Sequence, residues 1–139
     1  IKPTGKGGLI MYNQWMKELT QIIGVSGDEK RVSRYLAKAY QGQCDKIVYD
    51  NLGSVFALKK SKKENANRVM VCAHMDEVGF LVRHISDIGF VYLIALGGVL
   101  DKSKEMQKVR ITTCTGEKIT GILNVTKNEH GAVKDMYVD

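Results

Sequence analysis

A run of five consecutive apolar residues, 69–73, leads directly into His74, and Asp76 follows two positions later. Such a run is typical of a strand that is covered on both faces, as in the middle of a parallel or mixed α/β sheet. A strand here would place His74 at its carboxyl end, where open α/β sheets bind their ligands. The run therefore predicts an α/β fold with its chemistry at that edge of the sheet.

The pair His74 and Asp76 suits a metal site. Neutral imidazole binds zinc or cobalt through one ring nitrogen, and its other nitrogen commonly donates to a carboxylate that fixes the ring. In an extended chain, positions 74 and 76 point to the same side, which would let Asp76 orient His74. The spacing alone is short and common, and it fits a pair of ordinary polar residues equally well.

Residues 71–82 read Val-Cys-Ala-His-Met-Asp-Glu-Val-Gly-Phe-Leu-Val, and this stretch resembles the signature of the glutamyl or tetrahedral aminopeptidases. These are bacterial and archaeal metallopeptidases with paired metal ions. Further blocks follow the family order on both sides of the signature. They are residues 50–54, Gly97 and Gly98, and residues 107–111, 121–123 and 135–139. The resemblance covers most of the chain from about Met11 onward.

The resemblance implies a site and a reaction. His74 matches a metal ligand of the family, and Asp76 matches the catalytic-site carboxylate that orients it. The expected reaction is removal of N-terminal residues from short peptides by a metal-activated water, with two divalent ions, Zn or Co, in the complete protein. This chain supplies one ligand, because the family's other ligands and its glutamate base lie beyond Asp139. We therefore expect the chain alone to be inactive.

The alternative to an enzyme is a non-catalytic assembly or binding module that uses its β domain. The resemblance also implies peptide substrates and a homo-oligomer, which in relatives is a tetrahedral dodecamer. It leaves open whether acidic, basic or apolar N-terminal residues are preferred, since most of the specificity pocket lies downstream.

Four segments are expected along the chain. Residues 1–10 match no part of the family pattern, so we expect a leader or tag there. Residues 11–78 are expected to form the N-terminal segment of the catalytic domain. Residues 79–133 are expected to form an inserted small β domain, and residues 134–139 the strand that returns to the catalytic domain.

Local patterns predict the elements of residues 11–78. Apolar residues at three- and four-residue steps predict a helix over 13–23. Ser26 and Glu29 have the spacing of a capping box, which predicts a second helix to about Tyr40. Strands are predicted at 46–49 and 55–58, on either side of a turn-rich joint.

After Gly79 the pattern changes to short strands separated by regular turn signals. That rhythm predicts a small β-barrel or sandwich without crossover helices. The resemblance agrees, because the family inserts here a compact β domain that is likened to PDZ folds and used in subunit contacts. His84 and His130 fall in this part, and neither is expected to be a ligand.

Composition bears on partners and location. The net charge is +6, and its densest cluster, residues 59–63, contains no aromatic residue, which indicates a solvated loop rather than a nucleic-acid site. No apolar run has the length of a membrane span, and the first residues lack the apolar core of a signal peptide. Three cysteines without close pairing predict reduced, buried thiols. We expect a cytoplasmic protein without nucleic-acid or membrane partners.

Overall fold

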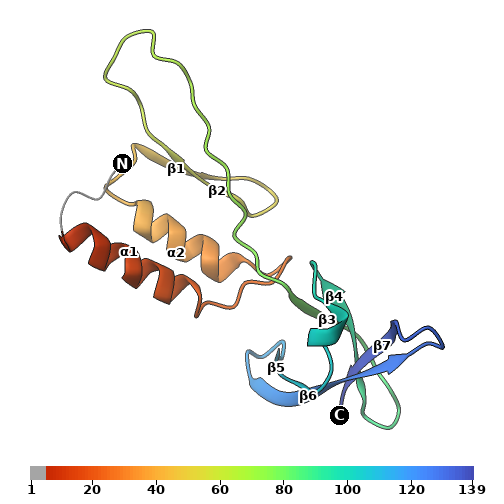
Figure 1. Cartoon of the computed structure of the whole chain (residues 1–139). Coiled ribbons are helices and arrows are strands. Elements are labelled where there is room, and N and C mark those ends of the chain that lie inside the picture. Colours follow the sequence, from red (N-terminus) through yellow and green to blue (C-terminus); the bar gives the residue numbers. More distant parts are fainter. Residues whose placement is uncertain (1–5) are drawn as a thin grey trace. The chain divides into compact units, whose positions relative to one another are not determined.

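The computed structural model describes residues 6–139, which form a mixed α/β fold (Figure 1). The chain divides into two compact units, one that extends to Glu77 and one that comprises Val78–Asp139. We call them unit 1 and unit 2. Residues 1–5 of the predicted leader lie outside the described residues, whereas residues 6–10 belong to the first helix.

Unit 1 begins with two helices, α1 (Lys6–Leu19) and α2 (Lys30–Tyr40). The first helix ends at Leu19, four residues before the predicted end. The face of α2 that carries Val32, Ser33 and Ala37 is buried. Tyr35 on α2 donates a hydrogen bond of 2.6 Å to the carboxylate of Glu18 on α1, which joins the two helices.

The predicted capping box at Ser26 and Glu29 is wrong. Glu29 occupies the N-cap position of α2, and no side chain caps that helix end. The carboxylate of Glu29 instead accepts the backbone N–H of Gly27 at 2.7 Å. The hydroxyl of Ser26 is used elsewhere, in a bond to Asp76.

A two-stranded antiparallel ribbon completes the regular structure of unit 1, and its two strands lie at the predicted residues. Its strands are β1 (Lys46–Tyr49) and β2 (Val55–Leu58), and α2 packs against β2. The Oδ1 atom of Asp50 accepts the N–H groups of Leu52 at 2.9 Å and Ser54 at 2.8 Å, which closes the turn between the strands. The lysine cluster 59–63 is an exposed loop.

The strand predicted at residues 69–73 does not form. These residues lie in a long connection without helix or strand, drawn in green in Figure 1. Val69, Met70 and Val71 are 84%, 78% and 92% exposed. A strand that is apolar on both faces needs neighbouring strands and two covering layers. Among the described residues, no strand pairs with this segment, so its apolar pattern has nothing to pack against.

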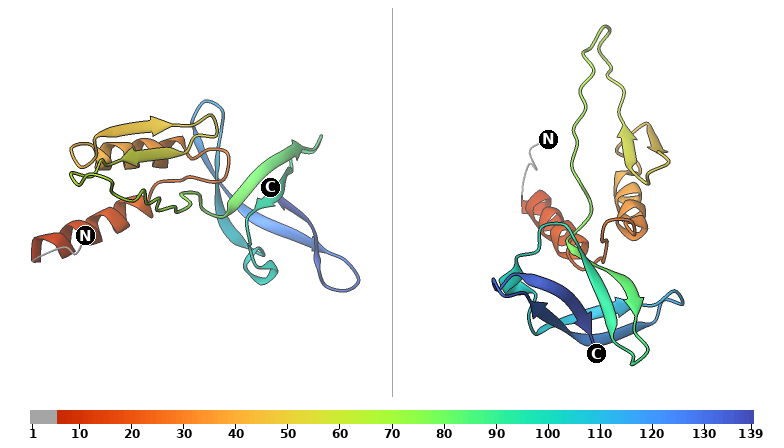
Figure 2. Two further views of the ribbon diagram at one scale, coloured as in Figure 1. Left: turned by 90° about the horizontal axis from the view of Figure 1, so that it is seen from above. Right: turned by 90° about the vertical axis from the view of Figure 1, so that its right-hand side faces the viewer.

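Unit 2 is a curled antiparallel sheet (Figure 2). Its order is β3-β4-β7-β6-β5, so the last strand in sequence is the middle one. The strands are β3 (Gly79–Ile85), β4 (Val91–Leu96), β5 (Gln107–Thr112), β6 (Lys118–Lys127) and β7 (Val133–Val138), with one short 3-10 turn, η1 (Asp101–Ser103). The prediction of short strands without crossover helices is confirmed.

The sheet of unit 2 is not the closed barrel or two-sheet sandwich that the sequence predicted. Within the part of the chain that the structure describes, β3 and β5 each pair on one side only. The predicted return strand corresponds to β7, which pairs with both β4 and β6. Its expected continuation to a catalytic domain stays a prediction.

The core of unit 2 lies on one face of the sheet. Leu93, Leu123 and Val138 are its buried residues, with exposures of 7%, 0% and 3%. Partly buried apolar residues surround them, namely Phe80, Val91, Val109, Ile111 and Met136. These residues come from all five strands, so the core ties the whole sheet together.

The three cysteines are free, as expected, but the prediction that they are buried is wrong for two of them. Cys44 is half-buried, whereas Cys72 and Cys114 are exposed. Cys72 is exposed because the strand expected around it does not form. Over residues 6–139, no helix combines the length and apolar character needed to cross a membrane.

Candidate functional site

His74 and Asp76 lie in contact, as the sequence predicted. Nδ1 of His74 is 3.1 Å from Oδ1 of Asp76 and 3.1 Å from the backbone oxygen of Asp76. A carbonyl oxygen and a carboxylate oxygen can only accept, so Nδ1 must carry the proton. In the neutral imidazole the lone pair then lies on Nε2. That nitrogen has no hydrogen-bond partner among the described residues, and the side chain of His74 is 87% exposed.

The carboxylate of Asp76 is held from a second side by Ser26. The Ser26 hydroxyl donates to Oδ2 of Asp76, while Oδ1 faces His74. The Ser26 hydrogen bond is the main cause that lowers the pKa of Asp76, and the His74 hydrogen bond adds to it. Hydrogen bonds to a charged group favour the charged form. Asp76 is therefore ionised at neutral pH.

The loop that carries Ser26 is fastened to the segment that carries Asp76. The N–H of Glu77 donates to the carbonyl of Gly24 at 2.8 Å. In return, the N–H of Gly24 donates to Oε1 of Glu77 at 3.1 Å. Val25 and Glu77 form an isolated parallel bridge. These contacts bring together two segments that are about fifty residues apart in sequence.

Two glycines let this loop adopt its shape. The N–H of Asp28 donates to the carbonyl of Val25 at 2.9 Å, which closes a turn with Ser26 and Gly27 at its centre. Gly27 has φ +93°, as the third position of a type II turn requires. Gly24 is buried, and a Cβ there would lie 2.5 Å from Cγ2 of Val32 on α2.

The arrangement fits one ligand of a metal site. An imidazole whose Nδ1–H is held by a carboxylate, with its Nε2 free, is the usual form of a metal-binding histidine. Catalytic zinc sites normally use three protein ligands. Within residues 6–139, no group of three histidine, cysteine, aspartate or glutamate side chains is placed to hold an ion. The chain thus offers one imidazole with its supporting carboxylate.

The other histidines have different surroundings. The ring of His84 on β3 stacks on Tyr92 of β4, with centroids 4.6 Å apart and an interplanar angle of 5°. His130 lies in the exposed loop after β6, 3.7 Å from the carboxylate of Glu129. Each of these two histidines thus makes its contact within unit 2. That neither is a metal ligand stays a prediction.

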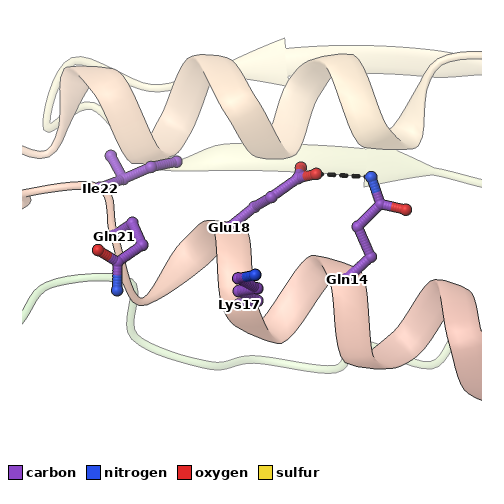
Figure 3. A pocket seen from close by; sticks show the side chains of 5 residues that line it. All are labelled: Gln14, Lys17, Glu18, Gln21 and Ile22. Carbon is purple, nitrogen blue, oxygen red and sulfur yellow. Dashed lines mark hydrogen bonds between the residues drawn. The ribbon is translucent and has the colours of Figure 1, made fainter.

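A second candidate site is a groove along the end of α1 (Figure 3). It is lined by Gln14, Lys17, Glu18, Gln21 and Ile22. Gln14 and Tyr35 both donate to the carboxylate of Glu18, and the bond from Tyr35 is the main cause that lowers its pKa. The carboxylate of Glu18 is thus occupied by hydrogen bonds within unit 1.

Comparison with known proteins identifies the family of the chain. Residues 53–136, more than half of the chain, match the family described as M42 glutamyl aminopeptidase. The chain belongs to this family. It is 41% identical over 104 residues to the glutamyl aminopeptidase of Lactococcus lactis subsp. cremoris, a match that covers 75% of this chain and 29% of that protein.

Two solved structures resemble the chain. One is the TET aminopeptidase of the marine sediment archaeon Thaumarchaeota archaeon SCGC AB-539-E09, with 30% identity and a TM-score of 0.80. That match covers 94% of this chain and 38% of the other. The second, PhTET1-12s, is described as a dodecamer and has 26% identity and a TM-score of 0.72, over 91% of this chain and 38% of that one. The chain spans about a third of the length of the curated M42 relatives it matches.

Sequence reasoning gave no role at this candidate site to two residues, Ser26 and Glu77. Ser26 was assigned to a helix cap, because its spacing to Glu29 fits that motif. Glu77 directly follows Asp76 within the family signature, and its side chain reaches back to the α1–α2 loop. The family resemblance was the sequence signal for residues 24–27, because the corresponding segment of the family lies close to the site.

Proposed function

We propose that this chain contributes to a metal-dependent aminopeptidase that removes N-terminal residues from short peptides. The observation that carries the proposal is the His74–Asp76 pair, with Nδ1–H directed at the carboxylate and Nε2 left free. It lies inside the region that matches the M42 family. Membership of that family supports a peptidase, and the geometry supports a role for these two residues.

In the proposed mechanism, His74 would hold one of two divalent ions through Nε2. Such ions, when bound, lower the pKa of the attacking water and polarise the peptide carbonyl. Asp76 accepts the hydrogen bond from Nδ1–H of His74. That bond keeps the imidazole in the tautomer that has its lone pair on Nε2. The lowered pKa of Asp76 keeps its carboxylate charged, and so keeps that hold, further into the acidic range than for an ordinary aspartate.

Other parts of the proposal rest on the relatives. The chemistry of one imidazole with a carboxylate is compatible with Zn and with Co. We propose a homo-oligomer, since one solved relative is described as a dodecamer. We also propose that unit 2 corresponds to the small PDZ-like domain expected at residues 79–133, which would make subunit contacts.

With one ligand and no group of three within residues 6–139, we expect the 139-residue chain by itself to be inactive. The alternative function is that of an assembly module without catalysis. The separate core of unit 2 favours it, because a unit with its own core can act as a binding domain. A peptidase assay of this chain with added Zn²⁺ or Co²⁺ tests the first expectation, which robust turnover would contradict.

The central test uses a protein of the relatives' length that carries this sequence. His74→Ala should remove metal and lower kcat by more than about 100-fold, beyond the cost of losing a residue that only supports a ligand. Asp76→Asn should retain most of the metal and lower kcat by about 10- to 100-fold. His130→Ala, an exposed histidine outside the site, is the matched control and should change neither. Wild-type activity and metal content in His74→Ala would rule out the proposed role.

A further inference from the structure

We infer that Ser26 is a positioning residue of the site, which acts on His74 through the carboxylate of Asp76. This inference rests on the proposed function, since it assigns a part to a residue of the same site. The evidence for it differs from that for the proposed function, because it concerns a residue of the α1–α2 loop and not the family signature around residue 74.

A chain of two hydrogen bonds joins Ser26, Asp76 and His74. Ser26 donates to Oδ2 of Asp76, and Oδ1 of Asp76 receives the Nδ1–H of His74. The last torsion of an aspartate side chain has broad energy wells and is weakly fixed by its own rotamer. The carboxylate of Asp76 is also 36% exposed, so packing alone does not fix it. The Ser26 bond therefore sets the plane of the carboxylate, and that plane sets the acceptor presented to His74.

Ser26 is itself held in place by its turn. It occupies the second position of the turn closed by Val25 and Asp28, whose next residue, Gly27, has positive φ. On the other side, Gly24 exchanges two hydrogen bonds with Glu77. A hydroxyl held between these two fixed points costs little extra entropy to order when it binds Asp76.

Positioning of the Asp76 carboxylate by Ser26 can be distinguished from docking of the α1–α2 loop. The two Gly24–Glu77 hydrogen bonds and the Val25–Glu77 bridge already fasten the loop without the Ser26 side chain. Removing the hydroxyl should therefore leave the loop in place and release the carboxylate. A purely structural role for Ser26 predicts the opposite, namely that the loop detaches.

The first experiment measures the tautomer of His74 by ¹⁵N NMR of the imidazole in the 139-residue chain without metal. In wild type the Nδ1–H tautomer should dominate, and in Ser26→Ala the two tautomers should mix. Ser26→Thr, which keeps a hydroxyl, should restore the wild-type signal. Ser61→Ala is the matched control. Ser61 is likewise a serine of an exposed loop, and its hydroxyl accepts the N–H of Lys63 at 2.9 Å.

The second experiment measures steady-state kinetics and bound metal in the protein of the relatives' length. Ser26→Ala should lower kcat about tenfold, at the lower end for loss of a group that supports a metal ligand, with KM and metal content unchanged. Ser26→Thr should recover most of that loss, and Ser61→Ala should match wild type.

The outcomes distinguish the two proposals. A wild-type tautomer and wild-type kcat in Ser26→Ala, beside an inactive His74→Ala, would overturn the inference and leave the proposed function standing. Rapid hydrogen exchange at the Gly24 and Glu77 amides in Ser26→Ala would also overturn it, in favour of loop docking. Full activity in His74→Ala would overturn the proposed function itself.

Discussion

The core of unit 2 and the site region of unit 1 are held in place by different means. In unit 2, Leu123 is completely buried and Val138 nearly so, and the strands around them are paired on both sides. In unit 1, the apolar residues that precede His74 are exposed, and the site depends on a few hydrogen bonds between two loops. The geometry of the core thus follows from packing, and that of the site from polar contacts.

This difference has a practical meaning. Buried apolar contacts tolerate little change in volume, whereas exposed hydrogen bonds are individually worth little to stability. Substitutions in the core of unit 2 should therefore unfold it, while substitutions at the site should change geometry more than stability. Three substitutions and one pH titration test this distinction.

Leu123→Ala should have the largest effect on folding. Removal of a fully buried leucine side chain leaves a cavity in the core of unit 2 and should lower the free energy of unfolding by about 3 kcal/mol. Hydrogen exchange of the amides in β6 and β7 during urea unfolding would measure it. Ile122→Ala on the same strand, where the side chain is 39% exposed, should cost less than half as much. Equal costs would contradict the assignment of the core.

Gly24→Ala is the strongest single change available at the site loop. The new methyl group would lie 2.5 Å from Cγ2 of buried Val32, so either α2 or the loop must shift, at a cost of about 1 to 3 kcal/mol. Fluorescence of Trp15, the single tryptophan of the chain, follows unfolding of unit 1. Gly98→Ala in unit 2, where a Cβ meets nothing within 4 Å, is the control and should be close to neutral.

Acid should weaken unit 1 through Asp76. Its folded pKa lies below the unfolded value of about 3.9, so its contribution to stability is present above that pH. The contribution is lost as the pH falls through the folded pKa. The difference in urea midpoint between wild type and Asp76→Asn should thus be largest above about pH 5 and should vanish in strong acid. A difference that grows on acidification would contradict the direction of the shift.

Val71→Ala should have the smallest effect. Its side chain is 92% exposed in this chain, and surface substitutions usually change stability by less than about 0.5 kcal/mol. The urea midpoint measured by Trp15 fluorescence checks this. A cost near that of Leu123→Ala would show that residues 69–73 are packed after all.

The elements that sequence reasoning predicted are those with local signals. Strands β1 and β2 lie at the predicted residues 46–49 and 55–58, and the residues after Gly79 form short strands, as the turn signals there indicated. The contact between His74 and Asp76 was also predictable, because two-residue spacing is local.

The predictions that were wrong depended on distant parts of the chain. Residues 69–73 have the composition of a buried strand, yet a strand needs partners that composition does not reveal. Ser26 fits a helix cap by spacing, but Asp76, fifty residues away, accepts its hydrogen bond instead. Local and distant acceptors compete for such a hydroxyl, and only the fold decides between them.

The position of β7 has a consequence for how unit 2 is made on the ribosome. Hairpins β3–β4 and β5–β6 can each close as soon as they emerge, since their partners are neighbours in sequence. Among the described residues, no strand pairing links the two hairpins until β7 arrives, when Val138 pairs with Val91 on one side and Leu123 on the other. The two hairpins of the nascent unit therefore stay unpaired with each other until β7 is synthesised. Pairing of β7 with both hairpins then makes the folding of unit 2 cooperative.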